Sequence, residues 1–334
     1  GARDFNMFTS KKFGKWGFTN LASMHLHKAY DPDNDGYSDV AQVSKYNFNP
    51  KLFYRPNNKT SLYFGATISQ EKREGGSIYK INNENISPGT LYFLDKQESS
   101  RLTTQMSAHY KLNQNTITLK NSISSFDRYI NIDENILGSS TQFGGNQFNT
   151  YTELNYNINK ENQNLNVGLN AITEKFKEDS YIPHPLRNQE NQTLGLYINH
   201  LWDMSNQFSI ESGIRTDKVA ASSVTTNSEN QIFILPKIGA LYKLSPELSI
   251  RFGGGMGYRM PTIFNEEAEP YGYRNIHPID FENTQPEESY GTNLDLKYQS
   301  TFNTENIFLT LNQMFFYNVI NNPIILDEQD ISNL

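Results

Sequence analysis

The sequence predicts an all-β fold, a transmembrane antiparallel up-and-down β-barrel to which the chain contributes about fourteen strands. Three observations lead to this fold class. Apolar residues recur at every second position in many segments, these segments are long, and the connections between them are alternately short and long. No run approaches the ~18 consecutive apolar residues of a membrane helix, whereas a barrel strand shows only every second residue to lipid.

Residues 248–259, LSIRFGGGMGYR, show the alternation clearly. The apolar parity consists of Leu248, Ile250, Phe252, Met256 and Tyr258. The other parity is small or polar and includes Arg251 and Arg259. Because a buried charge needs a partner, we expect the apolar parity to face lipid and both arginines to face a wet lumen. There we expect them to pair with acids of neighbouring strands, such as Glu211 and Asp217, or to brace the wall against a plug or a loop.

The same pattern places the other strands in chain order. In residues 62–68 and 165–171, for example, apolar residues alternate with polar residues and glycine. The expected strands are 3–13, 17–29, 44–56, 60–72, 98–112, 115–130, 145–159, 163–177, 192–204, 207–219, 230–244, 247–260, 286–300 and 305–318. A membrane-crossing strand needs about 9–11 residues, whereas soluble strands average about 5–6. The lengths therefore favour a membrane barrel.

The connections between these strands fall into two sets. Short turns are expected near residues 15, 58, 114, 161, 205 and 246, and long loops at 30–43, 73–97, 131–144, 178–191, 220–229 and 261–285. The two sets alternate, so a meander places all the long loops at one end, as in bacterial outer-membrane barrels. A soluble β-sandwich, the alternative, has turns about every 8–12 residues without this asymmetry.

Composition excludes several other functions. The net charge of −7 and the pI of about 5.5 do not suit a nucleic-acid partner. The chain has no cysteine, and therefore no disulfide, thiolate metal site or cysteine nucleophile. No nucleophile elbow, zinc-protease motif or phosphate-binding glycine loop is present, so we do not expect an enzyme.

We expect residues 1–334 to form one partial barrel domain, without a plug domain. After the last expected strand comes an acidic tail, VINNPIILDEQDISNL, which gives no strand to pair with the first. An open edge in lipid leaves backbone groups unsatisfied, so the sequence is interpreted as the middle of a larger barrel. A complete fourteen-stranded passive channel is the alternative.

Three motifs resemble the barrel of TonB-dependent outer-membrane transporters. GYRMPTIFNEE opens a long loop with Tyr258, Arg259 and Pro261. NTQPEESYGTNLDLKYQ closes that loop with Asn283, Pro286, Glu287 and Ser289. FSIESGIRTDKV resembles a strand motif of the family through Gly213, Arg215 and Asp217. The many Asn and Lys residues resemble the Bacteroidota branch.

The resemblance implies a barrel of about 22 strands with an N-terminal plug, which this sequence lacks. It also implies a monomer in the bacterial outer membrane that imports a scarce nutrient under the control of the TonB complex. An iron chelate such as a siderophore is the first expectation, with haem or cobalamin next. A surface lipoprotein is a further conceivable partner, and a calcium-ordered surface binding protein is the non-transport alternative.

DPDNDGYSDV, residues 31–40, is the sharpest local motif for a metal. Its carboxylates belong to Asp31, Asp33, Asp35 and Asp39, with Gly36 at the sixth position. This spacing directs several oxygens at one point, as Ca²⁺ requires, although the twelfth position is glutamine rather than glutamate. An acidic turn without a metal is the alternative. His25 and His27, two residues apart on one strand face, are a weaker metal candidate.

The long loop 261–285 is the candidate substrate-contact segment. It contains Tyr271, Tyr273, Arg274 and His277. The resemblance implies a haem ligand at His277, because the haem-uptake branch of the family places a histidine between the same two motifs. General contact with a substrate, or a solvated loop, are the alternatives.

Overall fold

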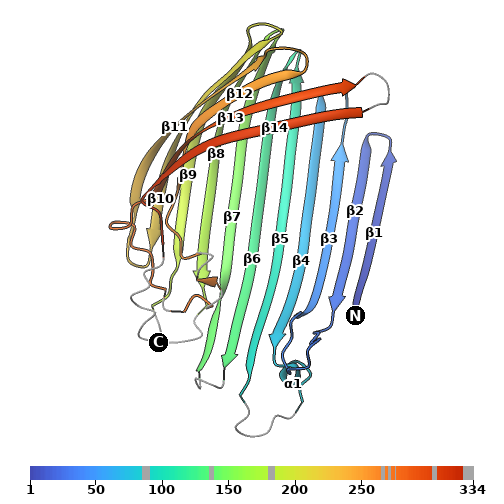
Figure 1. Cartoon of the computed structure of the whole chain (residues 1–334), viewed down its shortest axis with the longest axis vertical. Helices are drawn as coiled ribbons and strands as arrows, with labels where there is room; N and C mark the ends of the chain where they lie inside the picture. Colours follow the sequence, from blue (N-terminus) through green and yellow to red (C-terminus); the bar gives the residue numbers. More distant parts are fainter. Residues whose placement is uncertain are drawn as a thin grey trace.

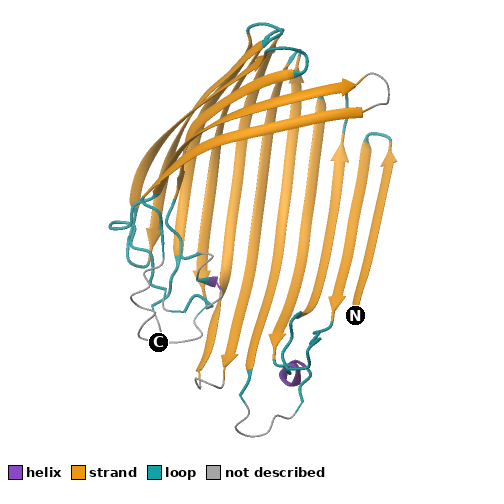
Figure 2. Ribbon diagram, viewed as in Figure 1, coloured by secondary structure: helices purple, strands orange, loops and turns teal. Residues whose placement is uncertain are grey.

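The computed structural model describes residues 1–84, 91–134, 139–179, 185–264, 268–269, 272–274, 276–302 and 307–325, with the side chains of Ser139, Phe302 and Ile307 left out. Fourteen strands form one antiparallel sheet in chain order, each paired with the next (Figures 1 and 2). In Figure 1 the sheet curls, so that β13 and β14 cross in front of the middle strands. The first and last strands are its two edges, and the sheet is not closed.

The strands have the following bounds. The first seven are β1 (Ala2–Phe13), β2 (Trp16–His27), β3 (Gln42–Tyr54), β4 (Thr60–Gly76), β5 (Phe93–Leu112), β6 (Asn115–Glu134) and β7 (Ser139–Lys160). The second seven are β8 (Gln163–Glu178), β9 (Gln189–Asp203), β10 (Phe208–Ser223), β11 (Glu229–Lys243), β12 (Leu248–Arg259), β13 (Glu287–Phe302) and β14 (Ile307–Asn321). The predicted fold class and strand order are confirmed. The predicted long loops 131–144 and 220–229 are partly strand, because β6 and β7 leave only residues 135–138 between them and β10 and β11 leave only 224–228.

The two sides of the sheet differ in chemistry. One side, here called the outer face, carries exposed apolar residues such as Leu102, Ile123 and Leu196. The opposite side, the inner face, carries polar side chains such as Lys120 and Glu153, which form an ion pair 2.9 Å long. A wall that is apolar outside and polar inside is typical of a membrane barrel.

The middle strands are longer than a membrane requires. β7 has 22 residues, against the about 9–11 that cross a bilayer. Its outer face carries the exposed apolar residues Leu154 and Phe148, but two residues beyond Phe148, Asn146 donates a 3.0 Å hydrogen bond to Asp127 of β6. We infer that β5–β8 continue beyond the apolar band on the side of the long connections.

The described parts of the long connections contain little regular structure. A single helical turn, α1 (Ile78–Ile81), lies between β4 and β5. Within the described residues, no helix is both long and apolar enough to cross a membrane. Bridges join Tyr30 to Val40 and Tyr37 to Ser77, so the β2–β3 connection packs on the end of β4.

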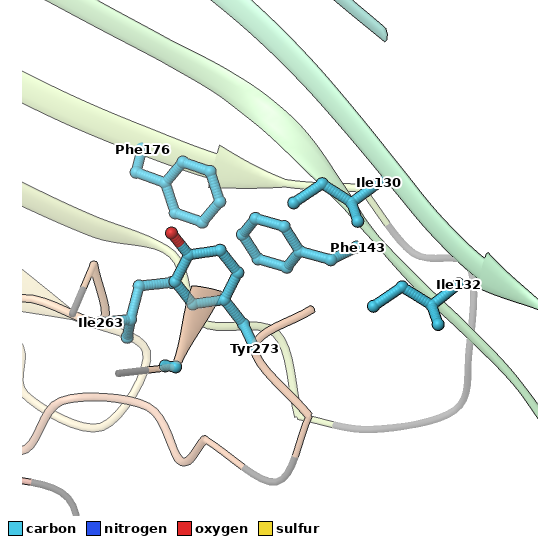
Figure 3. Packing of buried hydrophobic residues seen from close by; sticks show 7 residues of the cluster. Ile130, Ile132, Phe143, Phe176, Ile263 and Tyr273 are labelled. Atoms are coloured by element: carbon cyan, nitrogen blue, oxygen red, sulfur yellow. The ribbon is translucent and has the colours of Figure 1, made fainter. Parts of the chain in front are cut away.

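The main buried apolar cluster lies at this end of the molecule, on the inner face (Figure 3). Strands β6–β8 contribute Ile130, Ile132, Phe143 and Phe176, and the β12–β13 connection contributes Ile263, Ala268 and Tyr273. The strand register places Ile130 directly opposite Phe143. The cluster therefore holds a long connection against the inner wall.

Candidate functional site

The β12–β13 connection, residues 260–286, is anchored by the ring of Tyr273. The ring centroid lies 4.5 Å from that of Phe143 and 5.9 Å from that of Phe264, the latter edge-on. Tyr273 is 4% exposed, and its ring lies between Phe143, Phe176 and Ile263 in Figure 3. Burial raises the pKa of the Tyr273 hydroxyl above its usual value.

The backbone must turn sharply to place this ring. Gly272 and Tyr273 both have positive φ values, 62° and 56°. A side chain at Gly272 would meet Ile132 and Thr141 at 3.2 Å, so glycine allows the close approach of the loop to the wall. A non-glycine residue with positive φ is uncommon, and here the aromatic packing of Tyr273 stabilises it.

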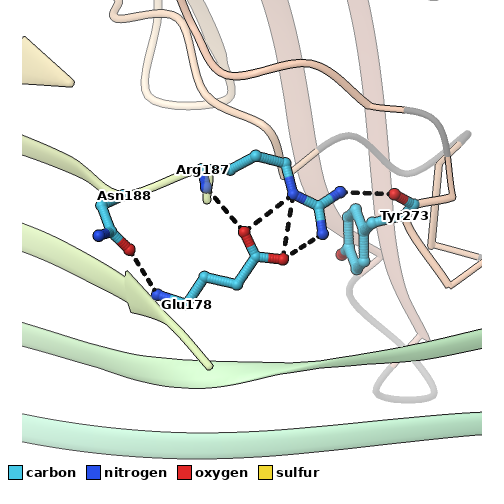
Figure 4. A network of polar contacts seen from close by, with 4 residues as sticks. All are labelled: Glu178, Arg187, Asn188 and Tyr273. Carbon is cyan, nitrogen blue, oxygen red and sulfur yellow. Dashed lines mark hydrogen bonds and ion pairs between the residues drawn. The ribbon is translucent and has the colours of Figure 1, made fainter. Parts of the chain in front are cut away.

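A buried ion pair holds the same turn from the other side (Figure 4). Arg187 and Glu178 are 5% and 3% exposed. The Arg187 Nε donates to Glu178 Oε1 at 3.1 Å, and the Arg187 backbone N–H donates to Oε2 at 2.7 Å. The Arg187 Nη1 donates to the carbonyl oxygen of Tyr273 at 2.6 Å. Both charges are therefore satisfied, which a buried pair requires.

Further polar contacts fix the connection along its length. The guanidinium of Arg274 donates from Nε to Thr141 Oγ1 at 2.8 Å, and Arg128 forms an ion pair with Glu269. The end of β10 holds the second half, because Ser223 Oγ donates to the Ile279 carbonyl oxygen at 2.6 Å. The connection is thus bound to the walls on both flanks and covers part of the inner face.

The predicted contact residues of this loop have different environments. The side chains of Tyr273 and Arg274 are used to pack the loop, whereas His277 is exposed. Tyr271 lies outside the described residues. Of the described candidates, His277 is the most exposed side chain.

The acidic β2–β3 connection brings three of its four predicted carboxylates together. Oxygens of Asp31, Asp33 and Asp39 all lie within 4.8 Å of one another. Asp31 shapes the turn by accepting the N–H groups of Asn34 at 2.7 Å and Gly36 at 2.9 Å. Both of these residues have positive φ, 60° and 88°. Such a turn directs carboxylates inward, as a hard cation needs.

Asp35, the fourth candidate, accepts the N–H of Tyr37 at 2.8 Å. A hydrogen bond that protonated Asp33 donates to the Asp31 carboxylate, together with the charge of Asp35, raises the pKa of Asp33 above its usual value. Like charges this close repel one another, and repulsion by Asp35 contributes to the raised pKa. A bound cation would relieve this repulsion.

The predicted pairing of the two lumen arginines with Glu211 and Asp217 is wrong. Glu211 pairs with Lys237 at 2.7 Å, and Asp217 pairs with Arg215 at 2.8 Å. Arg215 lies on the same strand as Asp217, and Lys237 lies on the strand next to Glu211. Both cations are therefore closer to the two acids than the arginines of β12 are. Arg259 lies 3.7 Å from Glu287, which faces it on β13.

Arg251 is exposed, and Arg259 also donates to the carbonyl oxygen of Phe264 at 3.4 Å. The second contact agrees with the expectation that Arg259 braces the wall against a loop. Any contact of either arginine with a plug stays a prediction.

Tyr258 differs from the predicted lipid-facing parity. Its hydroxyl donates to Asp217 Oδ2 at 3.0 Å, and its ring stacks on Phe233 with centroids 3.8 Å apart. The pairing of β11 with β12 ends at Lys237 and Gly255, beside Pro236, which has no N–H to donate. Beyond that point β11 no longer fixes the side on which Tyr258 lies, and the phenol reaches the inner face.

The His25–His27 pair lies on the inner face of β2. The His25 Nδ1 is 2.7 Å from Asp4 Oδ1, and the two imidazole centroids are 6.5 Å apart. One imidazole nitrogen of His25 is therefore occupied by Asp4, and only its other nitrogen is left to bind a metal shared with His27.

Comparison with known proteins identifies the class. Residues 16–334 match the family model described as TonB dependent receptor-like, beta-barrel. Because the match covers nearly the whole chain, the chain belongs to the TonB-dependent receptor family, as the sequence motifs indicated. A search of curated proteins gives no significant match.

Solved structures confirm the fold. The FrpB iron transporter from Neisseria meningitidis (F3-3 variant) is 14% identical with a TM-score of 0.72, over 96% of this chain and 52% of that one. The copper transporter OprC is 11% identical with a TM-score of 0.72, over 96% and 52%. The ferric-catecholate import receptor Fiu from E. coli K12, in its closed form, is 13% identical with a TM-score of 0.66, over 96% and 56%. The chain thus spans about half the length of these structures.

Proposed function

We propose that this chain is the barrel part of an outer-membrane importer that takes up a scarce nutrient, foremost an iron chelate, with energy from the TonB complex. Family membership over residues 16–334 supports the transporter class. The observation that carries the proposal is the β12–β13 connection, which is bound over the inner face as a solute-contacting constriction would be. The proposed protein acts as a monomer, and a surface lipoprotein is a further proposed partner.

The names of the similar structures favour iron. FrpB is described as an iron transporter and Fiu as a ferric-catecholate import receptor, although OprC is described as a copper transporter. The test is uptake of radiolabelled ferric siderophore by cells that carry or lack the native gene. Uptake that requires both the gene and an active TonB complex would support the proposal. Equal uptake without TonB would instead favour a passive channel.

Haem import is the second candidate, and one observation favours it. His277 is exposed in the connection that covers the inner face, where an imidazole could bind haem iron. The neighbouring Ser223 and Thr225 hold the backbone beside it through the Ile279 carbonyl oxygen, at 2.6 and 2.8 Å. Growth on haem as the iron source, compared with growth on a ferric siderophore, separates the two substrates.

We also propose that the acidic β2–β3 connection binds one Ca²⁺ through Asp31, Asp33 and Asp39. The proposal is supported by the approach of their oxygens to within 4.8 Å and by the raised pKa of Asp33. The role of the ion would be to order this connection against α1 and the end of β4, which it already touches through the Tyr37–Ser77 bridge. Titration with a luminescent lanthanide tests it.

A further inference from the structure

An apolar groove of about 350 Å³ lies on the outer face of strands β11–β14. Exposed side chains of Ile238, Phe252 and Met256 form one part of its lining, and Tyr290 and Tyr317 form another. All five lie on the strand parity that carries the outer apolar band. The groove is therefore a hollow in the surface that meets the membrane.

Two features of the sequence make the wall hollow at this place. Gly254 faces outward between Ile238 and Thr292, its partners on the adjacent strands, and it has no side chain to fill the space. In addition, β11 and β12 stop pairing at Lys237 and Gly255, although both strands continue and stay paired on their other edges. Pro236, which lines the groove, lies directly beyond the last pair.

We propose that this groove binds one acyl chain of an outer-leaflet lipid. The groove is continuous with the outer apolar band, so the acyl chains of the bilayer are the molecules that surround it. Its β13 and β14 residues, Tyr290 and Tyr317, lie in the halves of these strands nearest the long connections, which is the extracellular end of such barrels. The inference rests on the proposed outer-membrane location, but not on which nutrient is imported.

The chemistry of the lining selects the chain rather than the headgroup. Lys237 is the charged residue in the lining, and its Nζ forms a 2.7 Å ion pair with Glu211 on the inner face. The tyrosine rings of Tyr290 and Tyr317 suit the boundary between acyl chains and headgroups. The groove thus offers apolar contact to a chain and no charge to a phosphate.

The strength of such a site comes from packing. Lipid tails are as apolar as leucine, so a chain gains no hydrophobic free energy by entering the groove. It gains van der Waals contacts with walls on both sides, which a flat barrel surface does not provide. The expected effect is therefore slow exchange of one lipid rather than tight binding of many.

The test is native mass spectrometry of the intact receptor, purified from outer membranes and delipidated stepwise in detergent. Dipalmitoyl phosphatidylethanolamine and lipid A are added back in separate arms. We expect one retained lipid per wild-type protein. Gly254→Leu, which fills the groove, and Tyr317→Ala, which removes a wall, should each lower its occupancy about threefold or more. Retention in both arms supports an acyl-chain site of general use, and retention of lipid A alone supports it and identifies the source.

Matched controls are available on the opposite part of the outer face. Ala66 and Phe64 of β4 share the outer parity, so Ala66→Leu and Phe64→Ala change the same surface away from the groove and should retain the lipid. Equal retention by wild type, Tyr317→Ala and Gly254→Leu would overturn the proposal, as would a second protein held in place of lipid. If Gly254→Leu does not fold, Tyr317→Ala decides. Siderophore uptake is measured in parallel. A wild-type protein that retains no lipid but takes up siderophore would show that the lipid proposal fails. A wild-type protein that retains the lipid but takes up no siderophore would show that the proposed function fails.

Discussion

The guanidinium of Arg187 lies between the carboxylate of Glu178 and the carbonyl oxygen of Tyr273, and it binds both. Glu178 ends strand β8, Arg187 lies just before β9, and Tyr273 lies in the β12–β13 connection. The pair therefore links the rim of the barrel wall to the loop that covers the inner face. Because it is buried, its removal should affect the loop far more than an exposed ion pair would.

Arg187→Ala is expected to release the turn around Tyr273. It removes the guanidinium that neutralises the buried Glu178 carboxylate, at a cost of about 3–5 kcal/mol. We expect faster hydrogen exchange in residues 272–274 and a loss of uptake. Lys175→Ala is the matched control, because its 2.9 Å pair with Glu190 has a half-exposed lysine, and it should change neither. Unchanged exchange in Arg187→Ala would show that the aromatic cluster alone holds the loop.

Asp33→Asn is expected to abolish lanthanide binding by the β2–β3 connection, because it removes one of three converging carboxylates. Asp35→Asn is the matched control with the same charge change, and it should retain most of the binding, since Asp35 caps the Tyr37 N–H. Equal loss in both variants would mean that only the net charge of the loop matters.

The same site should depend on pH in a defined direction. A carboxylate binds a cation only when it is deprotonated, and the pKa of Asp33 is raised by Asp31 and Asp35. As pH falls, protons should therefore displace the lanthanide at a higher pH than they would from an unperturbed aspartate. The apparent midpoint should move down in Asp35→Asn, because one repelling charge is gone.

The surroundings of each strand decide how well its bounds could be predicted from the sequence. Inside the bilayer, lipid on one face forces an apolar residue at every second position, and all fourteen strands were predictable from that pattern. Above the apolar band the outer face no longer meets lipid, and the inner face of β6–β8 is covered by the β12–β13 connection, so the pattern changes. This is why β5 begins at Phe93 rather than 98 and β7 at Ser139 rather than 145.

The site was less predictable, because its contacts depend on how the loops fold. The acidic cluster was visible as local spacing, and three of its four acids converge. By contrast, nothing in the sequence distinguishes Arg187 and Glu178 from other charges in the same long connection. The inward turn of Tyr258 depends on the end of the β11–β12 ladder, which only Pro236 indicated.

His277→Ala is expected to separate the two candidate substrates. If the exposed imidazole binds haem iron, growth on haem should fall about tenfold or more, while growth on ferric siderophore stays normal. His200→Ala is the control, because this histidine lies on β9 and contacts Gln163 at 3.3 Å, away from the loop. Normal growth of His277→Ala on haem would remove the haem candidate.

Asp217→Ala is expected to destabilise the barrel wall between β10 and β12. Asp217 is 2% exposed and accepts hydrogen bonds from both Arg215 and the Tyr258 hydroxyl. Its removal takes the carboxylate from the Arg215 guanidinium, which keeps its 3.2 Å bond to Asn170 Oδ1, and takes an acceptor from the Tyr258 hydroxyl. The strand seam at Pro236 has no adjacent β11–β12 pairing to compensate. We expect a cost of about 2–4 kcal/mol, measured as a lower temperature at which the folded barrel converts to the unfolded band on a denaturing gel.

Glu211→Ala removes an exposed acid from the same strand and should change that temperature little, because exposed pairs contribute about 0–1 kcal/mol. Equal shifts in the two variants would show that the Asp217 network does not stabilise the seam.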